Sequence, residues 1–290
     1  MSGYVIVTDS SCDMTAQMAQ ELDIQVAPLS VLLEGRSYKN YLDGREIAFS
    51  DFYAALRGGK LAKTSAVNIE DFVQLFTPIL EAGQDILYLG FSSALSATYQ
   101  CGASAMEMLR EKYPQRKLYA VDTLCASLGQ GLMVYYAALK KREGLSIEQV
   151  RDYVEQNKLH LCHWFTVDDL HFLKRGGRIS ATTEIIGTML SIKPVMHVDD
   201  EGRLIKVEIA KGRKGSIRRL KEKMAQSAVN PQDQVVFISH GDCLEDAEAV
   251  AQMVRERFGT QDIRINYVGP VIGAHSGPGT MALFFLGTKR

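Results

Sequence analysis

The sequence has little cysteine, and its cysteines follow no metal-binding or disulfide pattern. Its 290 residues include only one tryptophan, seven prolines and five cysteines. The cysteines are scattered along the chain without a Cys-x-x-Cys pair: Cys12, Cys101, Cys125, Cys162 and Cys243. An odd number of cysteines without regular spacing indicates reduced thiols, and it argues against a disulfide or zinc framework.

An excess of one charge and long apolar runs are also missing. The 33 basic and 34 acidic side chains leave a formal net charge of −1 at pH 7, so no global field attracts nucleic acid or an anionic membrane. No stretch reaches the roughly 18 apolar residues that cross a bilayer. The first residues lack the basic and apolar regions of a signal peptide. We therefore expect a cytoplasmic protein with no nucleic-acid partner and no stable membrane insertion.

The length predicts two domains, which we place at residues 1–157 and 158–290. In the first, apolar runs alternate with amphipathic stretches. Strands are expected at 4–8, 24–33, 86–89 and 117–122, and helices at 15–22, 47–56, 69–82 and from 127 to about 142. Asn68 is the expected N-cap of the third helix. This alternation predicts an α/β domain with a doubly wound, mainly parallel sheet.

The second domain mixes hairpins with helices. Asp199-Asp200-Glu201-Gly202 is a tight-turn signal between two apolar runs and predicts a hairpin. The other expected elements are strands at 160–167, 235–240, 263–268 and 281–286, and helices at 185–190, 214–228 and 245–258. This pattern predicts an α+β domain with a mixed sheet.

Residues 85–102 carry the clearest sign of a binding site. A buried strand ends at Gly90 and is followed by Ser92, Ser93 and Ser96, after which a helix rich in small residues begins. Ligands of α/β sheets gather at the carboxyl ends of strands, and the start of a helix attracts anions. One serine would suffice to cap the helix, so three favour a role in facing a ligand.

Several catalytic and cofactor patterns are weaker. Ser92, Ser93 or Ser96 could act with His275 and Asp9 as a serine hydrolase, although Ala94 replaces the second glycine of Gly-x-Ser-x-Gly. Gly129-Gln130-Gly131 lacks the third glycine of a dinucleotide fingerprint, so helix packing explains it better. His160 and His163 point to opposite faces of the expected strand, which argues against a metal site.

Seven motifs in order along the chain resemble the DegV family, whose members bind fatty acids and include the acyl-carrying subunits of bacterial fatty-acid kinase. The motifs are VTDSSCDM, KTS, SSALSATYQ, VDTLCASLGQG, LHFLKRGGRIS, SIKPVMHVDDEG and VGPVIGAHSGPG. The resemblance implies a DegV-like fold with the ligand between the two domains. It also implies a carrier that presents the carboxylate to an ATP-dependent kinase partner for acyl phosphate formation in phospholipid synthesis.

The resemblance assigns roles to residues of this chain. It implies that Thr64, Ser96 and His275 bind the fatty-acid carboxylate. Arg178, in Gly-Gly-Arg, matches an arginine near the head group or in partner docking. Lys211 stands where the family has another arginine, and lysine keeps the charge without the two-pronged donor geometry. No metal and no cofactor other than the bound fatty acid is implied.

The physical chemistry of a fatty acid suits such a carrier. Burying a dozen methylenes at about 0.8 kcal/mol each favours binding by roughly 10 kcal/mol before entropic losses. The tail should therefore set the affinity and the polar residues the orientation. We expect the tunnel wall to include Ile185, Ile186, Met189, Leu190 and Ile192, which core packing would explain equally well. A carrier of another amphiphile, without a kinase partner, is a further alternative.

Overall fold

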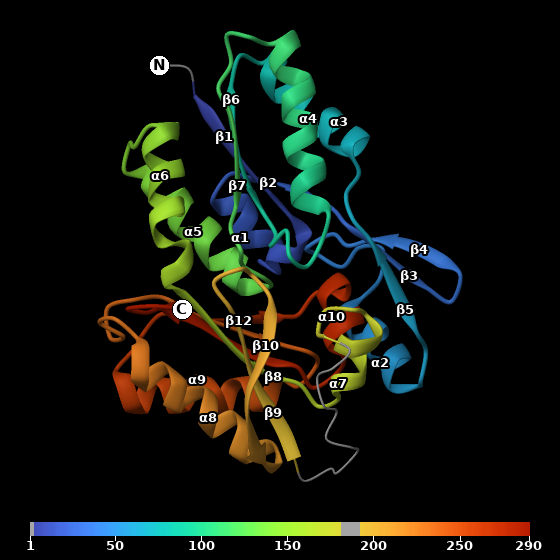
Figure 1. The fold of residues 1–290 in the computed structure, drawn as a ribbon, viewed down its shortest axis with the longest axis vertical. Coiled ribbons are helices and arrows are strands. Elements are labelled where there is room, and N and C mark those ends of the chain that lie inside the picture. The colour runs from blue at the N-terminus through green and yellow to red at the C-terminus, as the bar shows by residue number, and fades with distance from the viewer. Residues whose placement is uncertain (1–2, 181–191) are drawn as a thin grey trace.

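The computed structural model describes residues 3–180 and 192–290, whose strands form three sheets (Figure 1). Sheet A consists of four parallel strands. In spatial order they are β2 (Ile24–Ala27), β1 (Tyr4–Asp9), β6 (Asp85–Gly90) and β7 (Leu118–Asp122). Every residue of β6 is buried, as expected for an apolar strand that is covered on both faces.

Helices cover both faces of sheet A, which confirms the doubly wound arrangement (Figure 1). One face carries α3 (Ile69–Glu81) and α4 (Thr98–Lys112), and the other carries α1 (Ala16–Glu21), α5 (Leu128–Arg142) and α6 (Ile147–Asn157). The predicted cap of α3 is confirmed, because the Asn68 side chain accepts a hydrogen bond from the Asp71 amide.

Sheet C is mixed, as predicted for the second half of the chain. Among the strand pairs of this sheet in the described residues, β11–β12 alone is parallel. Its spatial order is β10 (Leu204–Lys211), β9 (Ile192–Val198), β8 (Leu161–Thr166), β13 (Met281–Leu286), β11 (Val236–His240) and β12 (Ile263–Tyr267). The predicted hairpin is β9–β10. Helices α8 (Gly212–Ser227) and α9 (Leu244–Phe258) pack on its outer face.

Helix α5 lies between sheet A and sheet C. Its first eight residues are buried, and it contacts β1 as well as β8, β11 and β13. A Cβ atom on Gly129 would lie 2.1 Å from His163 Nε2, and one on Gly131 would lie 2.6 Å from the Cys12 carbonyl oxygen. Only glycine permits both approaches without rearrangement, so the interpretation of this motif as helix packing is confirmed.

The expected single strand at 24–33 is wrong. β2 ends at Ala27, and β3 (Ser30–Leu33) belongs to a separate antiparallel sheet, sheet B, with β4 (Arg36–Lys39) and β5 (Ala62–Ser65). Pro28 lies between the two strands and has no N–H to continue a ladder. Sheet B packs with α2 (Phe49–Arg57) and with α10 (Pro270–Ser276), which also contacts α7 (Leu170–Arg175).

Some predictions fall outside this description. The expected helix at 185–190 lies outside the described residues. The domain boundary between residues 157 and 158 stays a prediction. Within residues 3–180 and 192–290, no helix combines the length and the apolar character required to cross a membrane.

Candidate functional site

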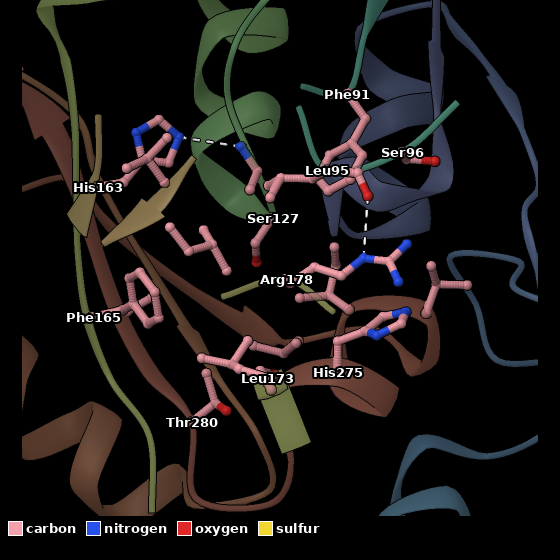
Figure 2. Close-up of a pocket in the computed structure, with 18 of the residues that line it drawn as sticks. Phe91, Leu95, Ser96, Ser127, His163, Phe165, Leu173, Arg178, His275 and Thr280 are labelled. Atoms are coloured by element: carbon pink, nitrogen blue, oxygen red, sulfur yellow. Dashed lines mark hydrogen bonds between the residues drawn. The ribbon is translucent and has the colours of Figure 1, made fainter. Parts of the chain in front are cut away.

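A cavity of about 270 Å³ lies where the two halves of the chain meet (Figure 2). It receives residues from the loop after β6, the segment just before α5, the inner face of sheet C and α10. Most of its wall is apolar, including Leu29, Phe91, Leu95, Phe165, Leu173, Val198, Leu204, Val268, Val271, Ile272 and Phe284. Such a shape and composition are typical of a site for a mainly apolar ligand.

Polar side chains gather at one end of the cavity. Thr64 on β5 and His275 on α10 face one another, with 2.8 Å between Thr64 Oγ1 and His275 Nε2. Arg178 lies beside them and its Nε donates a hydrogen bond to the Leu95 carbonyl at 3.1 Å (Figure 2). Burial lowers the pKa of Arg178, but a guanidinium remains charged in proteins. This end therefore combines one fixed positive charge with neutral hydrogen-bonding groups.

His275 is held in an environment that disfavours its charged form. Burial, followed by the charges of Arg178 and Arg175, lowers the pKa of its imidazole to about 4. Its Nδ1 is buried and has no hydrogen-bond partner among the described residues. A Cβ atom on Gly176 would lie only 2.2 Å from this Nδ1. The first glycine of the Gly-Gly-Arg motif therefore lets the end of α7 approach the histidine.

A second hollow of about 360 Å³ adjoins this polar end. It shares Thr64, Arg178 and His275 with the cavity and adds the basic residues Lys63 and Arg175. The three shared side chains thus form the boundary between the cavity and an outer, positively charged hollow. An anionic group bound at this boundary would be reachable from outside.

In the opposite region of the cavity, the described lining residues carry no charge, and these include His163. The Ala126 amide donates to His163 Nε2 at 3.2 Å, and Nδ1 lies 3.0 Å from the Leu161 carbonyl. These contacts fix a neutral ring that carries its proton on Nδ1. Burial holds the pKa of His163 well below its usual range. Its ring also packs edge-on against Phe284, so it acts as part of an apolar wall.

The structure brings together four of the five predicted site residues. Thr64, Ser96, Arg178 and His275 all line the cavity. The Ser96 hydroxyl lies 2.9 Å from Thr98 Oγ1 and accepts a hydrogen bond from the Thr98 amide. Lys211 is exposed at the end of β10 and lines neither hollow. Its role in partner docking stays a prediction.

The predicted tunnel wall differs from the described one. Ile185, Ile186, Met189 and Leu190 lie outside the described residues, and Ile192 does not line the cavity. Four apolar residues of the described wall were not predicted. They are Phe165 on β8, Phe284 on β13, and Val198 and Leu204 on either side of the β9–β10 turn. Their alternating apolar pattern is that of any buried strand, so nothing in the sequence separates them from ordinary core residues.

The serine hydrolase alternative is not supported. Ser92 Oγ donates to the Gly202 carbonyl at 2.9 Å, and Ser93 is exposed. His275 Nε2 faces Thr64 Oγ1, and His275 Nδ1 has no partner among the described residues. Neither ring nitrogen is therefore bonded to a serine there. Asp9 is buried elsewhere, where the amides of Ser11 and Phe91 donate to its carboxylate. Of the three serines after β6, only Ser96 lines the cavity.

Comparison with known proteins gives a consistent result. Residues 4–288 match the model of the DegV family. A DegV domain-containing protein of Clostridium perfringens is 48% identical over 290 residues, which are 100% of this chain and 99% of the relative.

Two solved structures have the same fold over nearly their whole length. A DegV family protein from Thermus thermophilus, described by its fatty-acid binding, has a TM-score of 0.85 at 31% identity, covering 97% of this chain and 98% of its own. DegV from Bacillus subtilis, described as a fatty acid binding protein, has a TM-score of 0.84 at 26% identity, with 98% and 99% covered.

We predict that His275 stays neutral in the free protein until the pH falls well below 6. Its folded pKa of about 4 lies below the value of about 6.5 of an unfolded chain. Neutral His275 therefore contributes stability above pH 6.5, and this contribution is lost as the pH falls from 6.5 toward 4. An NMR pH titration of the ring, assigned with His275→Gln, should give a midpoint near 4. A midpoint between about 6 and 7, the range of an ordinary histidine, contradicts this.

Proposed function

Because this chain belongs to the DegV family, we propose that it binds a long-chain fatty acid, such as palmitate or stearate, in the cavity. One observation carries the proposal: a mainly apolar cavity ends at a neutral Thr64–His275 pair beside the charged Arg178. An acyl tail matches the apolar wall, and a carboxylate matches the polar end. The Thermus and Bacillus relatives, described as binding fatty acids, support the same ligand class.

The carboxylate is held by donated hydrogen bonds in this proposal. Neutral His275 donates from Nε2 to Thr64 Oγ1, which leaves the Thr64 hydroxyl hydrogen free for the ligand. The cavity-facing Ser96 supplies a second hydroxyl, and Arg178 compensates the negative charge. Hydrogen bonds to a charged acceptor are stronger than neutral ones. The tail supplies most of the affinity and these groups set the direction in which the ligand enters.

We further propose that this protein is a lipid-binding carrier, and that an ATP-dependent fatty-acid kinase partner supplies the catalysis. The carboxylate would lie at the boundary with the outer hollow, where Lys63, Arg175 and Arg178 gather positive charge. A kinase that reaches this hollow could transfer a phosphoryl group to the carboxylate and form an acyl phosphate. Lys211 is a docking residue in this scheme. The scheme places the chain in the cytoplasm and in phospholipid synthesis.

The head-group assignment predicts that Thr64→Val weakens stearate binding by about two- to tenfold, the range for the loss of one hydrogen bond. Displacement of a fluorescent fatty acid measures this. Thr166→Val is the matched control, because the Thr166 hydroxyl is buried, has no partner in the part of the chain that the structure describes, and does not line the cavity. Equal affinities of the two variants would contradict the assignment of Thr64.

The carrier scheme predicts that stearate bound to this protein becomes phosphorylated when a fatty-acid kinase of the same organism and ATP are added. Arg175→Ala should slow acyl phosphate formation because it removes positive charge from the outer hollow, while stearate occupancy stays the same. Lys174→Ala, at a neighbouring position outside both hollows, is the control and should react at the normal rate. Absence of any acyl phosphate would remove the kinase from the scheme and leave the carrier.

A further inference from the structure

Two of the hydroxyl groups in the cavity wall lie against one another, away from its polar end. Ser127, just before α5, and Ser239, on β11, both line the cavity, and their Oγ atoms lie 3.0 Å apart. Both residues are buried. A buried hydroxyl is unfavourable in an apolar wall unless it is hydrogen-bonded, and alanine would fill a similar space. The pair therefore needs an explanation other than packing.

The pair lies away from the residues that we assign to the carboxylate. Ser127 lies between the Arg178–His275 end and the His163 side of the cavity (Figure 2). Across sheet C, Ser239 is paired with Ala282, and Ala282 is paired with Phe165. All three line the cavity, so Ser239 is the polar member of an otherwise apolar row. If the carboxylate of a fatty acid lies at Thr64, the methylene groups of its acyl chain would lie against this row.

The pair is connected to a buried carboxyl group. Ser127 Oγ lies 2.6 Å from Asp13 Oδ2, and the Gly269 amide donates to Asp13 Oδ1 at 3.0 Å. Burial raises the pKa of Asp13 to about 8. Ser127 also has a φ of 53° and ψ of −145°, a conformation that non-glycine residues rarely adopt. The fold thus holds the Ser127 hydroxyl in this position at the expense of backbone strain.

Ser239 keeps an unfilled hydrogen-bonding position in either protonation state of Asp13. A hydroxyl has one hydrogen to donate and two lone pairs. If Asp13 is ionised, Ser127 donates to Asp13 and Ser239 donates to Ser127, which leaves the Ser239 lone pairs for the cavity. If Asp13 is protonated on Oδ2, the direction reverses and the Ser239 hydrogen is free. Among the described residues, Ser127 is the only side-chain hydrogen-bond partner of Ser239.

We propose that the Ser127–Ser239 pair binds a hydroxyl group carried within the acyl chain, so that this protein prefers a hydroxylated long-chain fatty acid to the plain one. This inference rests on the proposed fatty-acid function and names a narrower ligand class for the same cavity. A hydroxyl both donates and accepts, so it satisfies Ser239 in either direction of the relay. A methylene or a carbon–carbon double bond offers neither in comparable strength.

The test compares stearic acid with a positional series of hydroxystearic acids in the displacement assay. For the wild-type protein we expect one position of the hydroxyl to bind about two- to tenfold more tightly than stearic acid, the range for one hydrogen bond. Ser239→Ala should abolish this preference. Ser216→Ala is the matched control, because Ser216 is also buried but donates to the Arg213 carbonyl in α8, outside the cavity, and should retain the preference. Ser239→Cys, which keeps the size with a weaker hydrogen-bonding group, replaces the alanine variant if that variant does not fold.

The outcomes separate this inference from the function on which it rests. If stearic acid binds but no hydroxystearic acid binds more tightly, the inference is wrong and the fatty-acid function stands. The same holds if a preference exists and survives unchanged in the Ser239 variants. If neither stearic nor any hydroxystearic acid binds, both fail. A preference that disappears with Ser239→Ala and persists with Ser216→Ala supports the inference.

Discussion

The structure depends on the close packing of helix α5 between two sheets. Gly129 and Gly131 let the helix approach His163 on one side and the Cys12 backbone on the other, at distances that no Cβ atom could tolerate. Gln130 between them is fully buried and donates to Thr8 Oγ1 at 2.9 Å. Because the helix begins at the point where the two halves of the chain meet, this packing also places the two residues just before it, Ala126 and Ser127, in the cavity wall.

Among the described residues that line the cavity, charge is found at one end only. Arg178 supplies a positive charge at the polar end, and the cost of burying it is reduced because that end adjoins the outer hollow. His275 stays neutral there because burial and two arginines oppose its protonation. His163 is neutral because both ring nitrogens are occupied by backbone groups. A ligand with one anionic end and a long apolar tail has one favourable orientation in such a cavity.

Much of the fold was predictable from the sequence, because parallel buried strands and amphipathic helices leave strong periodic patterns. The strand at 24–33 was not, since Pro28 divides one apolar run between two sheets, and only tertiary structure shows that β3 pairs elsewhere. The polar residues of the site could be found through their motifs. The apolar wall and the Ser127–Ser239 pair could not, because their contacts join segments more than 100 residues apart.

The central claim is that the cavity holds a long-chain fatty acid, and mass spectrometry of an organic extract tests it most directly. The protein should be purified gently, without detergent or delipidation, and its extract quantified against protein concentration. The account predicts one long-chain fatty acid per chain. An empty extract, together with no increase in melting temperature when palmitate, stearate or hydroxystearate is added, would contradict it.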